Sequence, residues 1–204
     1  MSRLPAHEPA TLTDARRRVY DAIAGGRRAT ASSGLVKADG SLAGPFNAWV
    51  HSPHIGERIQ AVGEAMRFEL SLPPRLAELA ILCVAREWQA QFEWYAHSRM
   101  AATAGLEADI IEALRVGDEP ALRDDADRAV HRVATGLLGP GHRVSDADYR
   151  AAVEQLGIDQ VVELVNLVGY YCLVSSVLNA FEVALPDGVT PPFAEPGDRT
   201  GAAS

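Results

Sequence analysis

A glutamate and a histidine stand four residues apart in the segment 92–97, FEWYAH. In a helix this spacing puts Glu93 and His97 on one face, within reach of each other. A carboxylate beside an imidazole orients the ring and raises its basicity, so the pair could accept or donate protons in a reaction. Solvent-exposed pairs without any catalytic role also have this spacing.

A second carboxylate, Glu78, lies in a segment that is otherwise apolar, 76–85, LAELAILCVA. A helix with apolar residues on all sides is buried, so a carboxyl group within it must be paired, hydrogen-bonded or protonated. One interpretation is a second acid–base group that works with His97. The other is a residue near a helix start, stabilised by the helix dipole and by Arg75 or an arginine of another chain.

Aromatic residues gather around these positions, although only 6% of the chain is Phe, Trp or Tyr. A pocket wall or a subunit contact explains such a cluster better than a solvated face does. Arg86 could bind a substrate carboxylate. His51 could point into the pocket or cap a helix, and Tyr170 could line the pocket or pack in the core. The candidate substrate-binding residues are therefore Trp88, Trp94, Tyr95, Arg86, His51 and Tyr170.

The two cysteines, Cys83 and Cys172, lie far apart in apolar runs and form no CxxC pair. Peroxide reduction by thiols needs an attacking cysteine with a lowered pKa and a resolving partner, and neither cysteine has that setting. Free thiols favour a reducing compartment, so we expect a cytoplasmic protein. The sequence contains no HExxH motif, phosphate-binding loop or dinucleotide fingerprint, so we expect no metal and no cofactor.

The spacing of the acidic residues and the histidine resembles the carboxymuconolactone decarboxylase and AhpD-like family. Glu78 is followed after fifteen residues by Glu93 and after four more by His97, then by an Ala-rich turn and Gly105. The segment 44–53, GPFNAWVHSP, also resembles the family, and the resemblance covers 44–111. The AhpD branch carries a CxxC where this chain has Ala90 and Glu93, so the reactive thiols are absent. The decarboxylase branch has Glu-x3-His, as this chain has.

The resemblance implies an all-α, AhpD-like domain with two similar helical halves, assembled as a homo-oligomer (dimer, trimer or hexamer). It implies a cofactor-free lyase or isomerase that acts on a small carboxylated or lactone metabolite. In that reaction His97 would donate or accept the proton, Glu93 would orient it, and Glu78 would be a second acid–base group or hold a water. The alternative is a non-catalytic, oligomeric small-molecule binding protein on the same scaffold. An alkylhydroperoxidase-like antioxidant role is disfavoured because the CxxC is missing.

Glycine and proline residues divide the chain into segments with helical patterns, and no alternating pattern typical of a strand is present. We expect a single domain over 1–185 and a tail over 186–204, with 27–45 as a loop. Segments 75–85 and 160–170 share an apolar start with Glu in the fourth place, which is a faint sign of an internal repeat. The expected helices are 14–24, 46–51, 53–70, 75–104, 107–116, 121–138, 145–156 and 158–185.

The distance between the two glutamates tests whether they share a site. On one straight helix Glu78 and Glu93 would lie about 22 Å apart. They can meet only if the helix is interrupted and the chain turns back. Neither Gly nor Pro stands between them. The resemblance nevertheless implies an interruption near Glu87–Gln91.

Composition excludes some classes of partner. The 204 residues carry a net charge of −8, which argues against a nucleic-acid-binding surface and a polybasic membrane anchor. The segment 161–184 is long enough to span a bilayer, but its glutamates, asparagines and serines favour a helix buried in the protein or at a subunit interface. The first thirty residues lack the apolar stretch of a signal peptide, so none is expected.

Overall fold

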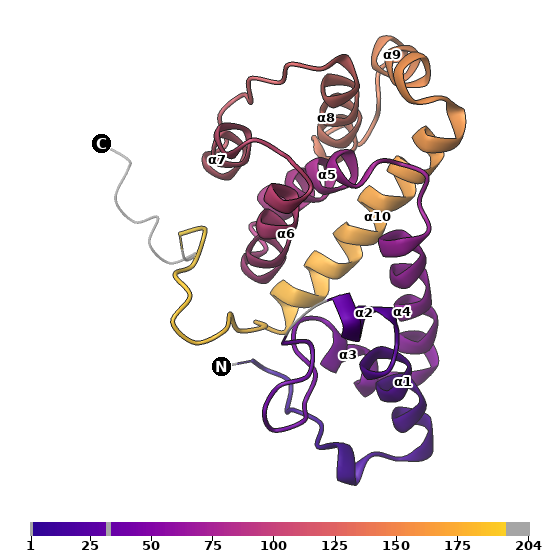
Figure 1. Ribbon diagram of the computed structural model, residues 1–204, viewed down its shortest axis with the longest axis vertical. Helices are drawn as coiled ribbons and strands as arrows, with labels where there is room; N and C mark the ends of the chain where they lie inside the picture. Colours follow the sequence, from indigo (N-terminus) through magenta and orange to yellow (C-terminus); the bar gives the residue numbers. More distant parts are fainter. Residues whose placement is uncertain (1, 32–33, 195–204) are drawn as a thin grey trace. The chain divides into compact units, whose positions relative to one another are not determined.

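A computed structural model describes residues 2–31 and 34–194 of the chain. These residues form α-helices joined by short connections, and they contain no β-strand beyond an isolated bridge between Val36 and Leu42. Residues 195–204 of the expected tail lie outside the described part. The elements (Figure 1) are the 3-10 turn η1 (Pro9–Thr11) and the helices α1 (Asp14–Ala24), α2 (Arg27–Ala31), α3 (Phe46–His51), α4 (Pro53–Phe68), α5 (Pro74–Glu87), α6 (Gln91–Thr103), α7 (Ala108–Val116), α8 (Asp125–Leu138), α9 (Asp146–Leu156) and α10 (Ile158–Ala180).

The expected all-helical class is confirmed. One helix was not expected, and three expected helices, 53–70, 121–138 and 158–185, are shorter in the structure, with α4 ending at Phe68. Helix α2 lies inside the expected loop 27–45, where arginine and alanine favour a helical turn. Helix α8 begins at Asp125 rather than at 121. Helix α10 ends at Ala180, because Glu182 adopts a left-handed conformation (φ 47°) and the N–H of Val183 bonds back to Leu178.

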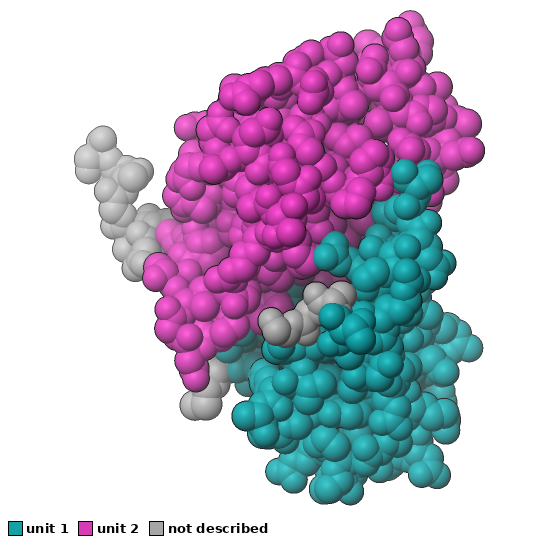
Figure 2. All heavy atoms as spheres, viewed as in Figure 1, with its two compact units in different colours: residues 1–71, 176–184 teal, residues 72–175, 185–204 magenta. Residues whose placement is uncertain are grey.

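The chain divides into two compact units, coloured separately in Figure 2. Unit 1 comprises 1–71 and 176–184, and unit 2 comprises 72–175 and 185–204. In unit 1, helix α1 packs against α2, α3 and α4. Unit 2 contains α5 to α9 and most of α10. Both segments of the suggested repeat, 75–85 and 160–170, belong to unit 2, and the expectation of two similar halves stays a prediction.

Helix α5 is the core element of unit 2. It packs against α6, α7 and α8, and its residues Leu79–Ala85 are all buried. A helix that is apolar on nearly every side is stable only when neighbours cover it, as these three do. The sequence thereby places one carboxylate of α5, Glu78, among apolar groups.

Helix α10 is long and apolar enough to span a membrane by length and composition. Within the protein, 44% of its most apolar 18-residue window is buried. Its buried residues include Leu164, Leu167 and Tyr171, whereas Val162 and Val165 are exposed. One face of α10 is therefore covered by the chain itself and another is not.

The expected interruption between α5 and α6 is confirmed. Helix α5 ends at Glu87, Gln89 adopts a left-handed conformation (φ 47°), and α6 begins at Gln91. The N–H of Ala90 bonds to the carbonyl of Ala85, and the N–H of Gln89 bonds to that of Arg86. This is the Schellman arrangement that ends many helices, with Gln in the place that Gly usually takes. The turn directs α6 back along α5.

Candidate active site

The turn brings Glu78, Glu93 and His97 into contact inside unit 2. The Nδ1 atom of His97 lies 2.7 Å from Glu78 Oε2, and its Nε2 atom lies 3.0 Å from Glu93 Oε1. The three side chains are 3%, 5% and 8% exposed, respectively. We call this group the Glu–His–Glu cluster. Because both ring nitrogens face carboxylates, the ring is placed to donate two hydrogen bonds, as only the imidazolium form can.

The electrostatic setting of His97 favours its charged form. Burial alone lowers the pKa of a histidine, because the imidazolium ion loses its hydration. The negative charges and hydrogen bonds of Glu78 and Glu93 outweigh that effect and raise the pKa of His97 to about 9. At neutral pH His97 is therefore an imidazolium in contact with both glutamates.

The partner of Glu78 is His97, and the interpretation that assigned Arg75 to it is wrong. Arg75 bonds instead to Asp127 with both terminal nitrogens, at 2.5 and 2.8 Å, and to Glu107 at 3.0 Å. Asp127 is fully buried, and its bidentate salt bridge with Arg75 connects α5 to α8. The counterpart of Glu78 in the suggested repeat, Glu163, accepts a hydrogen bond from the backbone N–H of Leu72.

Tyr171 of α10 completes the immediate surroundings of the histidine. Its ring packs edge-on against the His97 ring, with 5.0 Å between centroids. Tyr170, a sequence candidate, packs edge-on against Tyr171 at 5.4 Å rather than against His97. The tyrosine ring that contacts His97 is thus that of Tyr171.

Two further candidates, Trp94 and Tyr95, line a hollow of about 230 Å³ beside α6, which we call the Trp94 hollow. Trp94 is buried and packs against Phe193 at 5.3 Å between centroids, and the guanidinium of Arg99 lies 3.7 Å from the centre of the Tyr95 ring. The complete lining is Trp94, Tyr95, Ser98, Arg99, Val189, Thr190 and Pro192.

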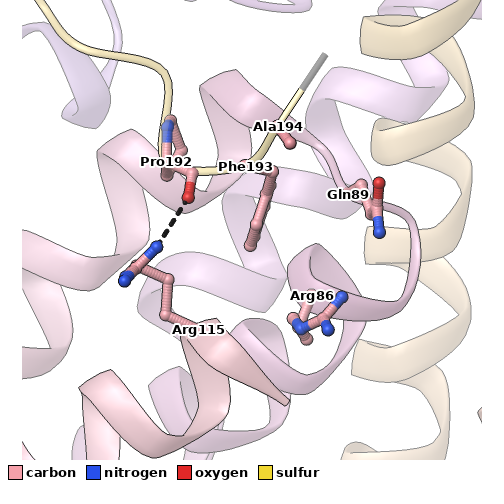
Figure 3. A pocket seen from close by; sticks show the side chains of 6 residues that line it. All are labelled: Arg86, Gln89, Arg115, Pro192, Phe193 and Ala194. Atoms are coloured by element: carbon pink, nitrogen blue, oxygen red, sulfur yellow. Dashed lines mark hydrogen bonds between the residues drawn. The ribbon is translucent and has the colours of Figure 1, made fainter. Parts of the chain in front are cut away.

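Arg86 lines a different hollow of about 200 Å³, the Arg86 hollow, with Gln89, Arg115, Pro192, Phe193 and Ala194 (Figure 3). Neither hollow is lined by a residue of the Glu–His–Glu cluster. Trp88 caps the end of α5 and is 38% exposed. The structure thus brings together the three candidate catalytic residues, and it places Arg86, Trp94 and Tyr95 at hollows that none of these three lines.

His51 belongs to unit 1, where it has partners of its own. Its Nε2 atom lies 3.0 Å from the carbonyl oxygen of Pro5, and its ring packs against that of His7 at a tilt of 42°, with 4.0 Å between centroids. Burial lowers the pKa of His7, and the positive charges of His51 and Arg16 lower it further. Within its unit, His51 therefore anchors the segment that precedes α1.

The residues that sequence reasoning missed are Gln89, Arg115 and Phe193. Gln89 gave no signal, because glutamine is an unusual choice for a left-handed turn. Arg115 and Phe193 are distant in sequence from Arg86, and only tertiary packing brings them to one hollow.

Neither cysteine has the character of a reactive thiol. Cys83 is buried, and burial raises its pKa to about 12. Burial also raises the pKa of Cys172, which a hydrogen bond with Trp88 partly offsets. The described residues contain no group of three or more His, Cys, Asp or Glu side chains arranged to hold a metal ion.

The arrangement of helices is that of the AhpD-like all-helical fold. It is shared with the crystal structure of an uncharacterized peroxidase-related protein with an alkylhydroperoxidase AhpD core from Ralstonia eutropha, at 19% identity and a TM-score of 0.70, over 91% of this chain and 93% of that one. A protein of unknown function from Agrobacterium tumefaciens, whose description names the antioxidant defence protein AhpD, matches at 15% identity and a TM-score of 0.60, over 67% of this chain and 93% of that one. At these identities the likeness shows the fold. No protein-family model and no curated protein matches the sequence.

Proposed function

We propose that the protein is a carboxymuconolactone decarboxylase-like lyase or isomerase, in which His97 transfers a proton to or from a small carboxylated or lactone metabolite without a cofactor. The observation that carries the proposal is the buried His97 ring held between Glu78 and Glu93. A proton donor for carbon must keep its proton at neutral pH, and the raised pKa of His97 provides that.

The proposed substrate is a β,γ-unsaturated or β-keto acid. The bond between the substrate carbon and its carboxylate breaks, CO₂ leaves, and the electron pair stays on carbon, delocalised into the adjacent double bond. The carbon then takes a proton from the His97 imidazolium, and solvent returns a proton to the ring. An isomerase would replace the loss of CO₂ by removal of a proton from carbon, which a glutamate of the cluster would accept; the His97 imidazolium would then protonate the new position, and the glutamate would return its proton to the ring.

The two glutamates have different parts in this proposal. The Glu78 oxygen is the nearer one, at 2.7 Å from Nδ1, so Glu78 orients the ring and stabilises its charge. Glu93 lies at 3.0 Å from Nε2, so it is the carboxylate that withdraws when Nε2 delivers its proton. This assignment gives Glu78 the orienting role that the resemblance implied for Glu93.

The test uses γ-carboxymuconolactone and a panel of small β-keto acids in D₂O. We expect release of CO₂ and incorporation of one deuterium at a carbon of the delocalised anion, both detected by NMR. His97→Gln should lower turnover by about 100-fold or more, and Glu93→Gln should lower it while preserving a hydrogen bond to the ring. His54→Gln, at an exposed histidine of α4, is the matched control. Turnover in His97→Gln equal to wild type would exclude the proposed role.

A second candidate function is non-catalytic binding of a small molecule by an oligomer. It is favoured by two observations, that both nitrogens of His97 are engaged and that neither hollow is lined by the cluster. A binding protein would show a ligand-dependent rise in melting temperature without consuming the ligand. The enzyme would convert the same compound.

The antioxidant description of the similar solved structures is a third possibility for this chain. The raised pKa of both thiols disfavours direct peroxide reduction by cysteine. Free thiols suit the reducing cytoplasm, which is the location we propose.

A further inference from the structure

The Arg86 hollow has features of a site for a small anion. Arg86 contributes a guanidinium whose Nε atom is buried and has no hydrogen-bond partner in the described part of the chain. Its Nη2 atom makes one long bond, 3.4 Å, to the carbonyl of Val116. No carboxylate of residues 2–31 and 34–194 forms an ion pair with Arg86. A guanidinium that lines a hollow without a carboxylate partner is an uncompensated charge, which favours an anionic acceptor in that hollow.

The chain holds Arg86 in place without neutralising it. A Cβ atom at position 117 would lie 2.5 Å from Arg86 Nη2, so Gly117 (φ 86°) leaves the space that the guanidinium occupies. The Phe193 ring packs on the other side, 5.8 Å from the guanidinium carbon. In Figure 3 this ring lies between Arg115 and the pair Arg86 and Gln89. A guanidinium fixed in advance loses little entropy when it binds a ligand.

Hydrogen bonds fix the part of the hollow that Pro192 and Phe193 form. The side-chain amide of Gln91 bonds to both backbone groups of Phe193, at 2.8 and 3.0 Å. Arg115 donates to the carbonyl of Pro192 at 2.9 Å and to both oxygens of Glu112. The positive charge of Arg115 is thus balanced by the Glu112 carboxylate, whereas no carboxylate of the described residues balances the charge of Arg86.

We propose that the Arg86 hollow binds a small organic carboxylate, with the carboxylate on Arg86 and the apolar part of the ligand against Phe193 and Pro192. Its volume of about 200 Å³ equals that of about seven liquid water molecules, which fits a small acid and not a nucleotide. Planar pairing of a guanidinium with a carboxylate favours this class of anion. Glu78 lies eight residues before Arg86, about 12 Å along α5, so this site is separate from the Glu–His–Glu cluster and stands whether or not the proposed catalysis does.

The test measures binding of benzoate by isothermal titration calorimetry, with neutral benzamide as the comparison ligand. We expect saturable binding of benzoate, binding of benzamide at least about 10-fold weaker, and a loss of about 10-fold or more in affinity for benzoate in Arg86→Gln. Arg99→Gln removes the same charge in the Trp94 hollow and should bind benzoate like wild type. Arg86→Lys keeps the charge but not the planar fork, and should bind more weakly than wild type.

Three results would overturn the proposal: no saturable binding of benzoate to the wild type, equal binding of benzamide, or unchanged affinity in Arg86→Gln. If Arg86→Gln does not fold, as judged by circular dichroism, Arg86→Lys decides, because an affinity equal to wild type in that variant would also contradict the planar pairing.

Discussion

His97 is charged because two buried glutamates, Glu78 and Glu93, lie beside its ring. With one carboxylate the loss of hydration would be harder to offset, and with none the ring would be neutral at pH 7. The cluster places an imidazolium and two glutamates among one another with side chains that are less than a tenth exposed. Such an arrangement is expensive to bury, which is why perturbed titratable groups often mark functional sites.

The raised pKa of His97 makes stability depend on pH. The ordinary value is 6.5 and the folded value is about 9. Between these values the folded state binds one more proton than the unfolded state, so stability falls as pH rises. Below pH 6.5 the contribution is fully present, and above pH 9 it is lost. We expect the free energy of unfolding in urea to fall by roughly 1–3 kcal/mol across this window.

Glu93→Gln is the variant that isolates this effect, because it removes one of the two charges that raise the pKa of His97. The decline between pH 6.5 and 9 should be smaller in that variant. His7 and His131, whose pKa values burial lowers, titrate below the window and do not contribute to it. Parallel curves for wild type and Glu93→Gln would contradict this account of the cluster.

At the scale of elements, the turn after α5 decides whether the site exists. Gln89 takes a left-handed conformation that costs a residue with a side chain about 1 kcal/mol relative to glycine. We expect Gln89→Gly to stabilise the protein by roughly 0.5–1 kcal/mol in urea unfolding, with the turn retained.

The matched control is the reverse substitution, from glycine to a residue with a side chain, at the end of α6. There Gly105 (φ 90°) occupies the same place in the same motif, with the N–H of Leu106 bonded to the carbonyl of Ala101. A Cβ at Gly105 would meet nothing within 4 Å, so only the backbone conformation is tested. Gly105→Ala should cost about 1 kcal/mol. A loss of stability in Gln89→Gly as large as that in Gly105→Ala would show that the conformation of Gln89 is not strained.

Helix boundaries were predictable from the sequence where a capping side chain or a glycine marks the end of the helix. The start of α9 follows Ser145, whose hydroxyl oxygen accepts from the N–H of Asp148 at 3.1 Å, and Gly105 and Gly117 end α6 and α7. It failed where Glu182 ends α10, because a left-handed glutamate has no signature in composition.

The candidate site was predictable only in the part that depends on local spacing along one helix. Glu93 and His97 are neighbours on one helix, so their contact follows from spacing. The contact of Glu78 with His97 depends on the turn at Gln89, for which only family resemblance gave an indication. The Arg86 hollow depends on residues from three distant segments, which no local pattern joins.

At the scale of the whole molecule, α10 leaves an apolar stripe uncovered. Ile158, Val162, Val165 and Leu173 lie on one face of the helix and are 49%, 53%, 42% and 38% exposed. No charged residue belongs to this stripe, and a second copy of the chain could present the same surface to it. The expected homo-oligomer is therefore proposed to form through α10.

Val165→Glu should weaken that association, because it places a charge in the middle of the stripe. Light scattering after size-exclusion chromatography should give a multiple of 21.8 kDa for the wild type and a lower mass for the variant. Glu154→Gln, at an exposed position of α9, is the control and should not change the mass. A monomeric wild type at high concentration would refute the oligomer.

If His97 is a buried imidazolium held by two glutamates, NMR of its ring nitrogens will show both of them protonated. In a ¹⁵N-histidine-labelled sample assigned with His97→Gln, or with the shift changes of Glu93→Gln if that variant does not fold, both ring nitrogens of His97 should be protonated at pH 7. They should titrate with a pKa near 9 in the wild type and at a lower value in Glu93→Gln. A neutral ring at pH 7, with a pKa at or below the ordinary 6.5, would contradict the account.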